Sequence, residues 1–335
     1  MHSTRKRILL HVDTGHVVAR LVARHGLAVT HRGGRAAAEP VRQIVRSRYQ
    51  VFVERIAAAV QAAHGARGAD IHRVDMDDLA GRLATIGGSK RCVSLHPFIE
   101  LDSRSLRISR LFELGGRTAL GYAGSPGSPP VKDQVRDIGA RVGRGPITLL
   151  DDDCFSNRFL PYVIDLLDAA GVAVEGIAVG VLVDPCAAEG FRERGVELTA
   201  LVDLSDVEVY DLCDTRDFLL GGDGTVVRFP GGATGRVPYV LPFVRLTDLL
   251  RMSTEDEVEF SQRILRANIE FFSCLESSGI EFRLSHIDAA FGAYLVDLLG
   301  CPGDEPLVRI ASRLLDLGAR RGRRSVGDVR RTSCG

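Results

Sequence analysis

The stretch 147–183 constrains the fold more than any other part of the chain. It opens with an apolar run at Ile147–Leu150, passes through a polar turn into a helical pattern over Phe159–Ala170, and ends in a second apolar run at Ala173–Val183. Unbroken apolar runs are typical of parallel strands, because helices cover both faces of a parallel sheet. A strand, a helix and a strand in this order form a βαβ unit. The sequence therefore predicts an α/β protein with a parallel sheet.

Weaker signals predict further elements on both sides of this unit. Apolar runs predict strands at Ile8–Val12, Cys92–Ile99 and Leu198–Val202, and further strands at Asp217–Leu220 and Tyr239–Phe243. Residues 115–130 are rich in Gly, Ser and Pro, so we expect a mobile loop there. Ser253 precedes three acids and is expected to cap a long helix. The spacing of apolar residues predicts helices over 15–25, 40–63, 75–83, 131–142, 253–277, 288–299 and 305–317.

Composition narrows the function classes. Lys+Arg and Asp+Glu are both 43, so the net charge gives no global attraction to nucleic acid or to an anionic membrane. The 7 cysteines are scattered without a C-x-x-C pair, which argues against a structural zinc site and a disulfide framework. No apolar run is long enough to cross a bilayer. We therefore expect a cytoplasmic protein with neither a membrane nor a nucleic acid as partner.

Three acids, Asp151, Asp152 and Asp153, directly follow the first apolar run. Ligands of open α/β sheets bind beyond the carboxyl ends of the strands. Carboxylates in that position can accept hydrogen bonds from sugar hydroxyls or hold a divalent cation. Residues Phe155–Arg158 begin a helix, whose free N–H groups suit a phosphate. The pattern predicts a site for a phosphorylated sugar; the structural alternative is that the acids only cap the helix, for which one acid would suffice.

The stretch 147–183 resembles the type I phosphoribosyltransferases in its apolar strand, its paired acids, the short loop after them and the helix and strand that follow. The resemblance implies that Asp151 and Asp152 contact the ribose of phosphoribosyl pyrophosphate (PRPP), and that Mg²⁺ bridges to its pyrophosphate. It implies transfer of the 5-phosphoribosyl group to an unidentified small-molecule acceptor with release of pyrophosphate. Asp153 is a further candidate Mg²⁺ ligand. The loop residues that would bind the 5-phosphate are Phe155, Ser156, Asn157 and Arg158.

This loop departs from the family pattern. The family usually has Thr-Thr-Gly-Thr or a similar loop, whereas this chain has one hydroxyl at Ser156, Asn157 at the glycine position and Arg158 at the last threonine. Asn tolerates a left-handed backbone, and Arg158 can supply a charge-assisted contact to a phosphate. The departures leave open a non-catalytic protein of the same fold that senses a sugar phosphate.

A second segment resembles the closing segment of purine phosphoribosyltransferases. It comprises residues 217–224 and the link 236–240, and the resemblance implies that Asp223 and Arg236 lie beside the pyrophosphate and the acceptor. Lys90 and Arg91 are further candidates for pyrophosphate contact.

The same segment supports a different function class. Gly221–Thr225 resembles the GGDGT turn of NAD kinases and diacylglycerol kinases, in which Asp223 would bind a metal or activate a hydroxyl. That turn should open onto a helix, which Pro230 and the glycines after it would stop. Another alternative takes Asp151 and Asp153 as the nucleophile and acid of a haloacid dehalogenase-like phosphotransfer enzyme. The histidines are dispersed; His11 and His16 flank Asp13, and we do not expect a metal site there.

The chain is thus expected to have four parts. A phosphoribosyltransferase-like core over 86–245 follows an N-terminal α/β extension over 1–85. A helical C-terminal region over 246–318 and a basic, disordered tail over 319–335 complete the chain. The flanking parts lie outside the resemblance and are candidates for an acceptor pocket or the surface of a homodimer.

Overall fold

A computed structural model describes residues 6–24, 38–65, 68–89, 91–99, 101, 104–116, 119–143, 145–155 and 158–318. The predicted tail over 319–335, Lys90, Ser156 and Asn157 lie outside the described residues. The chain forms two compact units: unit 1 comprises residues 1–12, 72–110 and 122–212, and unit 2 comprises residues 13–71, 111–121 and 213–335. Each unit is thus built from separate stretches of chain, and the stretch 86–245 contributes to both.

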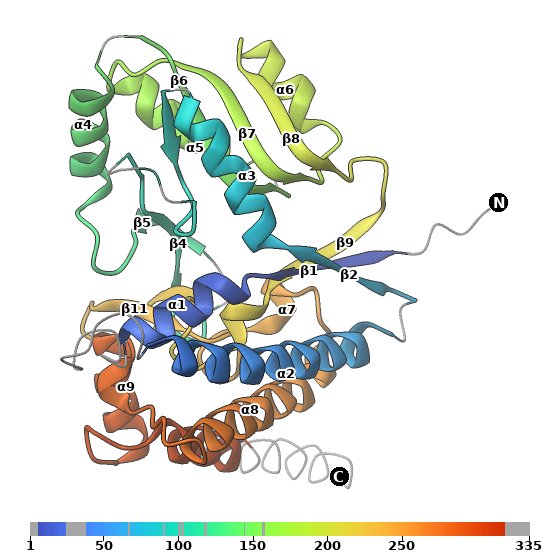
Figure 1. Cartoon of the computed structure of the whole chain (residues 1–335), viewed down its shortest axis with the longest axis vertical. Helices are drawn as coiled ribbons and strands as arrows, with labels where there is room; N and C mark the ends of the chain where they lie inside the picture. The colour runs from blue at the N-terminus through green and yellow to red at the C-terminus, as the bar shows by residue number, and fades with distance from the viewer. Residues whose placement is uncertain are drawn as a thin grey trace, which may run out of the picture. The chain divides into compact units, whose positions relative to one another are not determined.

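Unit 1 contains a four-stranded sheet in the order β3-β6-β7-β8. Three of its strands, β6, β7 and β8, are labelled in Figure 1. Its strands are β3 (Cys92–Ser94), β6 (Ile147–Cys154), β7 (Val174–Leu182) and β8 (Glu197–Asp203). All three pairs of neighbouring strands are parallel. The prediction of an α/β protein with a parallel sheet is therefore confirmed.

Helices cover both faces of this sheet, which explains the unbroken apolar strands. Leu149 of β6 belongs to the core shared with α4 (Val131–Val142) and α5 (Phe159–Ala169). Its neighbour Leu150 belongs to the core shared with α3 (Met76–Ser89) on the other face. A further helix, α6 (Ala187–Glu193), contributes the fully buried Phe191.

A three-stranded sheet places β1 (Arg7–Val12) between β2 (Asp70–Asp75) and β9 (Val209–Asp214). Leu9 of β1 shares a core with Leu79 of α3 and Val181 of β7. These contacts anchor β1 within unit 1.

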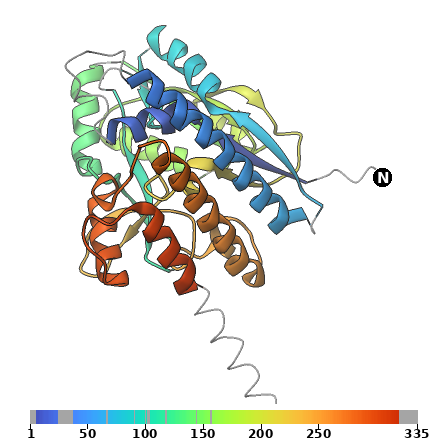
Figure 2. The same ribbon diagram turned by 60° about the horizontal axis from the view of Figure 1, so that its bottom comes forward.

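Unit 2 is mainly helical. Helices α2 (Ala38–His64) and α8 (Thr254–Glu276) pack side by side in both views (Figures 1 and 2), and the rings of Phe52 and Phe271 lie 5.6 Å apart between them. Helix α1 (Thr14–Arg24) packs against α2. As predicted, Ser253 caps α8 by accepting a hydrogen bond from the Asp256 N–H at 3.2 Å. The other helices of this unit are α7 (Leu246–Leu249), α9 (Ala289–Leu299) and residues 307–318.

A second four-stranded sheet has the order β11-β10-β4-β5, with strands β4 (Ile108–Glu113), β5 (Ala119–Gly124), β10 (Thr225–Arg228) and β11 (Thr234–Val237). Strand β5 corrects the expectation of a mobile loop over 115–130. Gly121 sits inside this strand with φ 121°, a backbone conformation that glycine adopts without strain.

Two strands that the sequence predicts do not form in the described residues. The sequence predicts a strand at Asp217–Leu220, but Thr215–Phe218 form a 3₁₀ helix. Tyr239–Phe243 form a turn in which the Phe243 N–H donates to the Val240 carbonyl at 3.0 Å. In both places the apolar residues are buried although they lie in turns, so a buried apolar run does not by itself indicate a strand.

Candidate functional site

The three consecutive acids are the last part of β6 and not the turn that the sequence predicts. Asp151 pairs with Val179 of β7, and Asp153 pairs with Val181. Backbone pairing thus continues the strand through polar residues. Because β6 lies between β3 and β7, the acids stand at an inner position of the sheet's carboxyl edge. This is where open α/β sheets bind ligands.

His96 and the backbone hold the carboxylate of Asp152 in place. Its Oδ2 lies 3.0 Å from Nε2 of His96, and its Oδ1 accepts a hydrogen bond from the Asp153 N–H at 3.0 Å. His96 comes two residues after β3, the parallel neighbour of β6, and the Leu95 N–H donates to the Leu150 carbonyl at 2.8 Å. The strand order therefore brings His96 to the acids.

The surroundings of Asp151 disfavour the charged form of its carboxyl. Burial raises the pKa of its carboxyl well above the usual range, and the negative charges of Asp152 and Asp153 raise this pKa further. A side-chain hydrogen bond with Asp152 acts in the same direction. These surroundings favour the neutral, protonated form of the Asp151 carboxyl.

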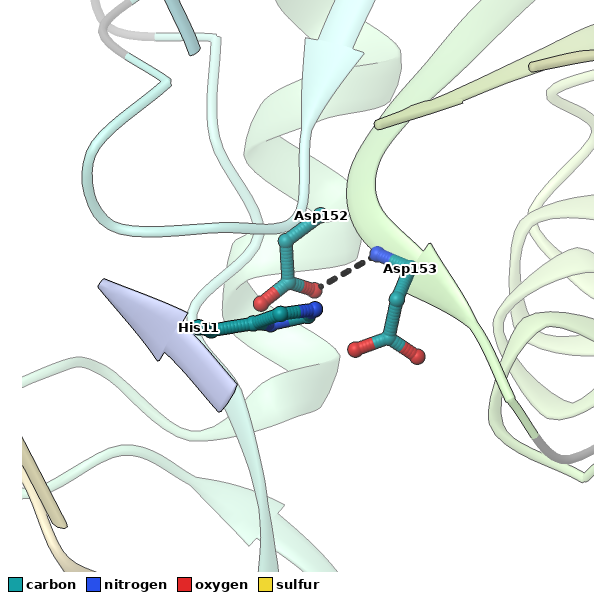
Figure 3. A group of neighbouring side chains, drawn as sticks. All are labelled: His11, Asp152 and Asp153. Carbon is teal, nitrogen blue, oxygen red and sulfur yellow. Dashed lines mark hydrogen bonds between the residues drawn. The ribbon is translucent and has the colours of Figure 1, made fainter. Parts of the chain in front are cut away.

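A histidine from another strand joins the two outer acids (Figure 3). His11 of β1 is completely buried, and one nitrogen of its ring, one oxygen of Asp152 and one oxygen of Asp153 all lie within 4.8 Å of one another. Oδ1 of Asp153 also accepts a hydrogen bond from the Phe155 N–H at 3.0 Å. One imidazole nitrogen and two carboxylate oxygens are a donor set for a divalent cation.

Two neighbours of the acids are structural. A Cβ on Gly180 of β7 would lie 2.6 Å from the Asp152 carbonyl oxygen, so only glycine lets the two strands approach here. Burial raises the pKa of the Cys154 thiol to about 12, and nearby carboxylates contribute. Cys154 is therefore a neutral thiol, which is neither a strong nucleophile nor a metal ligand.

The loop predicted to bind phosphate is described at its two ends. Phe155 is partly buried against the core that contains Leu9 and Val74. Arg158 is exposed directly before α5. Between them, Ser156 and Asn157 lie outside the described residues.

Arg91 lies at the opposite edge of the sheet. Its carbonyl accepts a hydrogen bond from the Thr148 N–H at 2.9 Å, at the start of β6. Its guanidinium is next to Gly145, where a Cβ would lie 2.9 Å from Nη1. The structure does not bring Arg91 to the acids, and its neighbour Lys90 is outside the described residues.

Asp223 and Arg236 belong to unit 2, where cationic groups surround the buried Asp223. Oδ2 of Asp223 lies 3.1 Å from Nε2 of His16, Oδ1 is ion-paired with Arg20, and the Asp223 carbonyl accepts a hydrogen bond from Arg236 at 3.1 Å. Burial, together with the charges of Arg24 and Arg236, lowers the pKa of Arg20 to about 9. The negative charge of Asp223 is thus balanced by cationic groups of unit 2.

The glycines around Asp223 are explained by packing. A Cβ on Gly222 would lie 2.1 Å from the Arg216 carbonyl oxygen, and one on Gly224 would lie 2.0 Å from the Val237 carbonyl oxygen. The segment then continues into strand β10 and not into a helix. A close backbone turn accounts for the Gly-rich sequence.

A second charge network in unit 2 is centred on Arg216, whose side chain is 7% exposed. Its guanidinium contacts Asp13 at 2.8 Å, Asp214 at 3.1 Å and Asp217 at 3.8 Å. Burial and the neighbouring carboxylates of Asp214 and Asp13 raise the pKa of Asp217 to about 7, and the charge of Arg216 opposes this shift.

His11 and His96 are not among the site residues that the sequence predicts. Along the chain His11 is near His16 and Asp13, whereas the acids beside it in the structure come from β6. The sequence signal that could identify them is their position, because each histidine lies at or just after the end of an apolar strand.

Comparisons with known proteins do not assign the chain to a family. No model of a known protein family matches the chain, and no curated protein sequence matches it either. Within the part of the chain that the structure describes, no helix is both long enough and apolar enough to cross a membrane. The case for a function therefore rests on the residues themselves.

Proposed function

We propose that unit 1 is a phosphoribosyltransferase-like core that binds PRPP with Mg²⁺ and transfers its 5-phosphoribosyl group to a small-molecule acceptor. The observation that carries the proposal is the acidic carboxyl end of β6, an inner strand of a fully parallel sheet, immediately before helix α5. Sugar-binding carboxylates beside a helix N-terminus suit a phosphorylated ribose.

Each residue has a defined role in this proposal. Asp152, oriented by His96, accepts hydrogen bonds from the ribose hydroxyls, and the buried Asp151 supports it from within the sheet. The exposed Arg158 and the first N–H groups of α5 bind the 5-phosphate. Mg²⁺, with Asp153 as a candidate oxygen ligand, would neutralise the pyrophosphate.

The reaction breaks the bond between the ribose C1 carbon and the pyrophosphate oxygen, and forms a bond from C1 to the acceptor. The acceptor loses a proton, and pyrophosphate leaves with the electron pair. Positive charge develops on the ribose ring during the transfer, and fixed carboxylates beside the ring stabilise that charge. Base, amine and hydroxyl acceptors all fit this chemistry.

A sensor that binds PRPP without turnover is the second candidate. Both acids that the family resemblance assigns to the ribose are buried, with Asp151 5% and Asp152 8% exposed, and the surroundings of Asp151 raise its pKa. A carboxyl at Asp151 that resists ionisation, together with Asn157 and Arg158 in the loop, favours binding over catalysis. A buried Asp151 is also poorly placed as the nucleophile of a phosphotransfer enzyme.

Calorimetry with PRPP and Mg²⁺ on the full chain tests the proposal. We expect Asp152→Asn to weaken binding by about tenfold or more, since it removes a charged acceptor worth roughly 1.5–3 kcal/mol. The matched control is Asp168→Asn, on the exposed face of α5, which should bind as the wild type does. Absence of binding by the wild type would refute the proposal. Binding without pyrophosphate release across a panel of acceptors would select the sensor.

A further inference from the structure

The ring of His11 and the carboxylates of Asp152 and Asp153 converge on one point, although they come from two different sheets (Figure 3). His11 is at the carboxyl end of β1, and the acids are at the carboxyl end of β6. His11 and Asp152 are buried, and Asp153 is partly exposed. The set therefore combines a dry interior side with an open side toward solvent.

The local charge favours a cation. Asp152 and Asp153 are adjacent acids at one strand end, and Asp152 is buried. Neighbouring carboxylates repel one another, and each charged form loses hydration on burial. A divalent cation at the point of convergence would offset both costs.

Groups outside the donor set hold both carboxylates in position. His96 and the Asp153 N–H contact the two oxygens of Asp152, each at 3.0 Å. The Phe155 N–H donates to Oδ1 of Asp153 at 3.0 Å. Such outer contacts orient ligands in metal sites and limit the rearrangement needed on binding.

The separations are close to those of a coordinated ion. The three ligand atoms lie within 4.8 Å of one another. Two ligands on opposite sides of an ion, with bonds of about 2.1 Å, are about 4.2 Å apart. Because 4.8 Å is the upper limit of these separations and adjacent ligands lie closer than opposite ones, closing the set around an ion takes an inward movement of the side chains.

The donor types select the ion. Mg²⁺ prefers oxygen ligands and keeps much of its water, whereas imidazole nitrogen suits first-row transition ions. Three protein donors leave coordination positions for water or for a ligand oxygen. We propose that His11, Asp152 and Asp153 bind a divalent first-row transition ion directly. The protein would hold this ion without substrate, at acids that the proposed function assigns to the ribose and to Mg²⁺, and its binding does not depend on that function.

Mn²⁺ alone is the probe, because carboxylates and imidazole bind it while the exposed thiol of Cys186 is a poor ligand for it. Chelator-treated wild-type protein is titrated with Mn²⁺ without PRPP, by calorimetry and by the electron paramagnetic resonance signal of the free ion. The variants are His11→Phe, which keeps the buried volume filled, and Asp153→Asn, which keeps the acceptor for Phe155. Their controls are His72→Phe on β2 and Asp168→Asn on α5.

We expect one Mn²⁺ per chain in the wild type and in both controls. His11→Phe and Asp153→Asn should each weaken binding by roughly 100-fold or more, since loss of even an outer partner costs about 10–100-fold. The proposal is overturned if the wild type binds no Mn²⁺, if Mg²⁺ displaces Mn²⁺ at equal concentration, or if Asp153→Asn binds normally. If circular dichroism shows that His11→Phe is unfolded, the Mn²⁺ affinity of Asp153→Asn alone decides the test. PRPP binding with Mg²⁺ is measured separately, so each proposal can fail without the other.

Discussion

The buried acids of the two units have different partners. In unit 2 the guanidinium of Arg216 contacts Asp13, Asp214 and Asp217, so a permanent cation sits among the carboxylates. In unit 1 the acids at the end of β6 have one another and the rings of His96 and His11 as neighbours. A histidine carries charge only when protonated.

This difference suggests a structural role for the acids of unit 2 and a binding role for the acids of unit 1. Acids gathered around an arginine have their charge balanced by the fold and stabilise it only while that arginine is present. Acids at the carboxyl edge of a parallel sheet, beside histidines, stand where open α/β sheets bind ligands.

Replacing Arg216 by methionine should give the largest effect. Arg216→Met leaves three carboxylates of unit 2 without their central cation, and breaking a buried pair costs about 3–5 kcal/mol of unfolding free energy. Urea unfolding followed by circular dichroism measures it. The control Arg263→Met removes an exposed pair with Glu259 and should cost about 0.5 kcal/mol or less. Equal losses in the two variants would contradict the structural role of Arg216.

Asp217 should make unit 2 less stable as pH rises. Its pKa is about 7 in the folded protein against 3.8 ordinarily, so the folded state binds the proton more tightly than the unfolded state. That contribution is fully present below about pH 4 and is lost as pH rises to about 7. The loss is on the order of 2 kcal/mol or more.

Asp217→Asn removes this titration. Between pH 5 and 8 the unfolding free energy of the wild type should therefore fall relative to that of the variant. The exposed Glu259→Gln is the control and should follow the wild type. A variant whose pH dependence equals that of the wild type would show that Asp217 has an ordinary pKa.

His96→Gln should have the smallest effect and act on ligand binding. Gln keeps a hydrogen-bonding group but not the ring that contacts Asp152, so PRPP binding should weaken by about tenfold, as for other orienting residues. Calorimetry measures the affinity. His72→Gln, on β2, should leave binding unchanged. Unchanged affinity in His96→Gln would remove His96 from the site.

The sequence predicts the parallel sheet well because its signal is local. Ile147–Leu150 and Ala173–Val183 are apolar on both faces, and helices do cover both faces of β6 and β7. Helix α4 matches its predicted range, and Ser253 caps α8 as expected. Strand β5 was missed because its glycines and nearby prolines are typical of loops, and only pairing with β4 makes it a strand.

Only part of the candidate site can be predicted from the sequence. The acids of β6 are visible as a run, but their place inside the strand depends on pairing with β7. His11 and His96 reach them through strand order and packing, which no local pattern encodes. The second predicted segment, around Asp223, is polar and Gly-rich because Arg20 and His16 surround its acid and the turn packs closely.

The most direct test of this contrast is thermal unfolding of Asp152→Asn, with and without PRPP and Mg²⁺. If Asp152 is held for a ligand, the variant without ligand melts at or above the wild-type temperature, because one buried negative charge is gone. The ligand should raise the melting temperature of the wild type, since a ligand at 100 times its dissociation constant stabilises by about 2.7 kcal/mol. The rise should be smaller in the variant, since tenfold weaker binding leaves about 1.4 kcal/mol of that stabilisation. A variant that melts several degrees lower and keeps the full ligand-induced rise would show that Asp152 is structural.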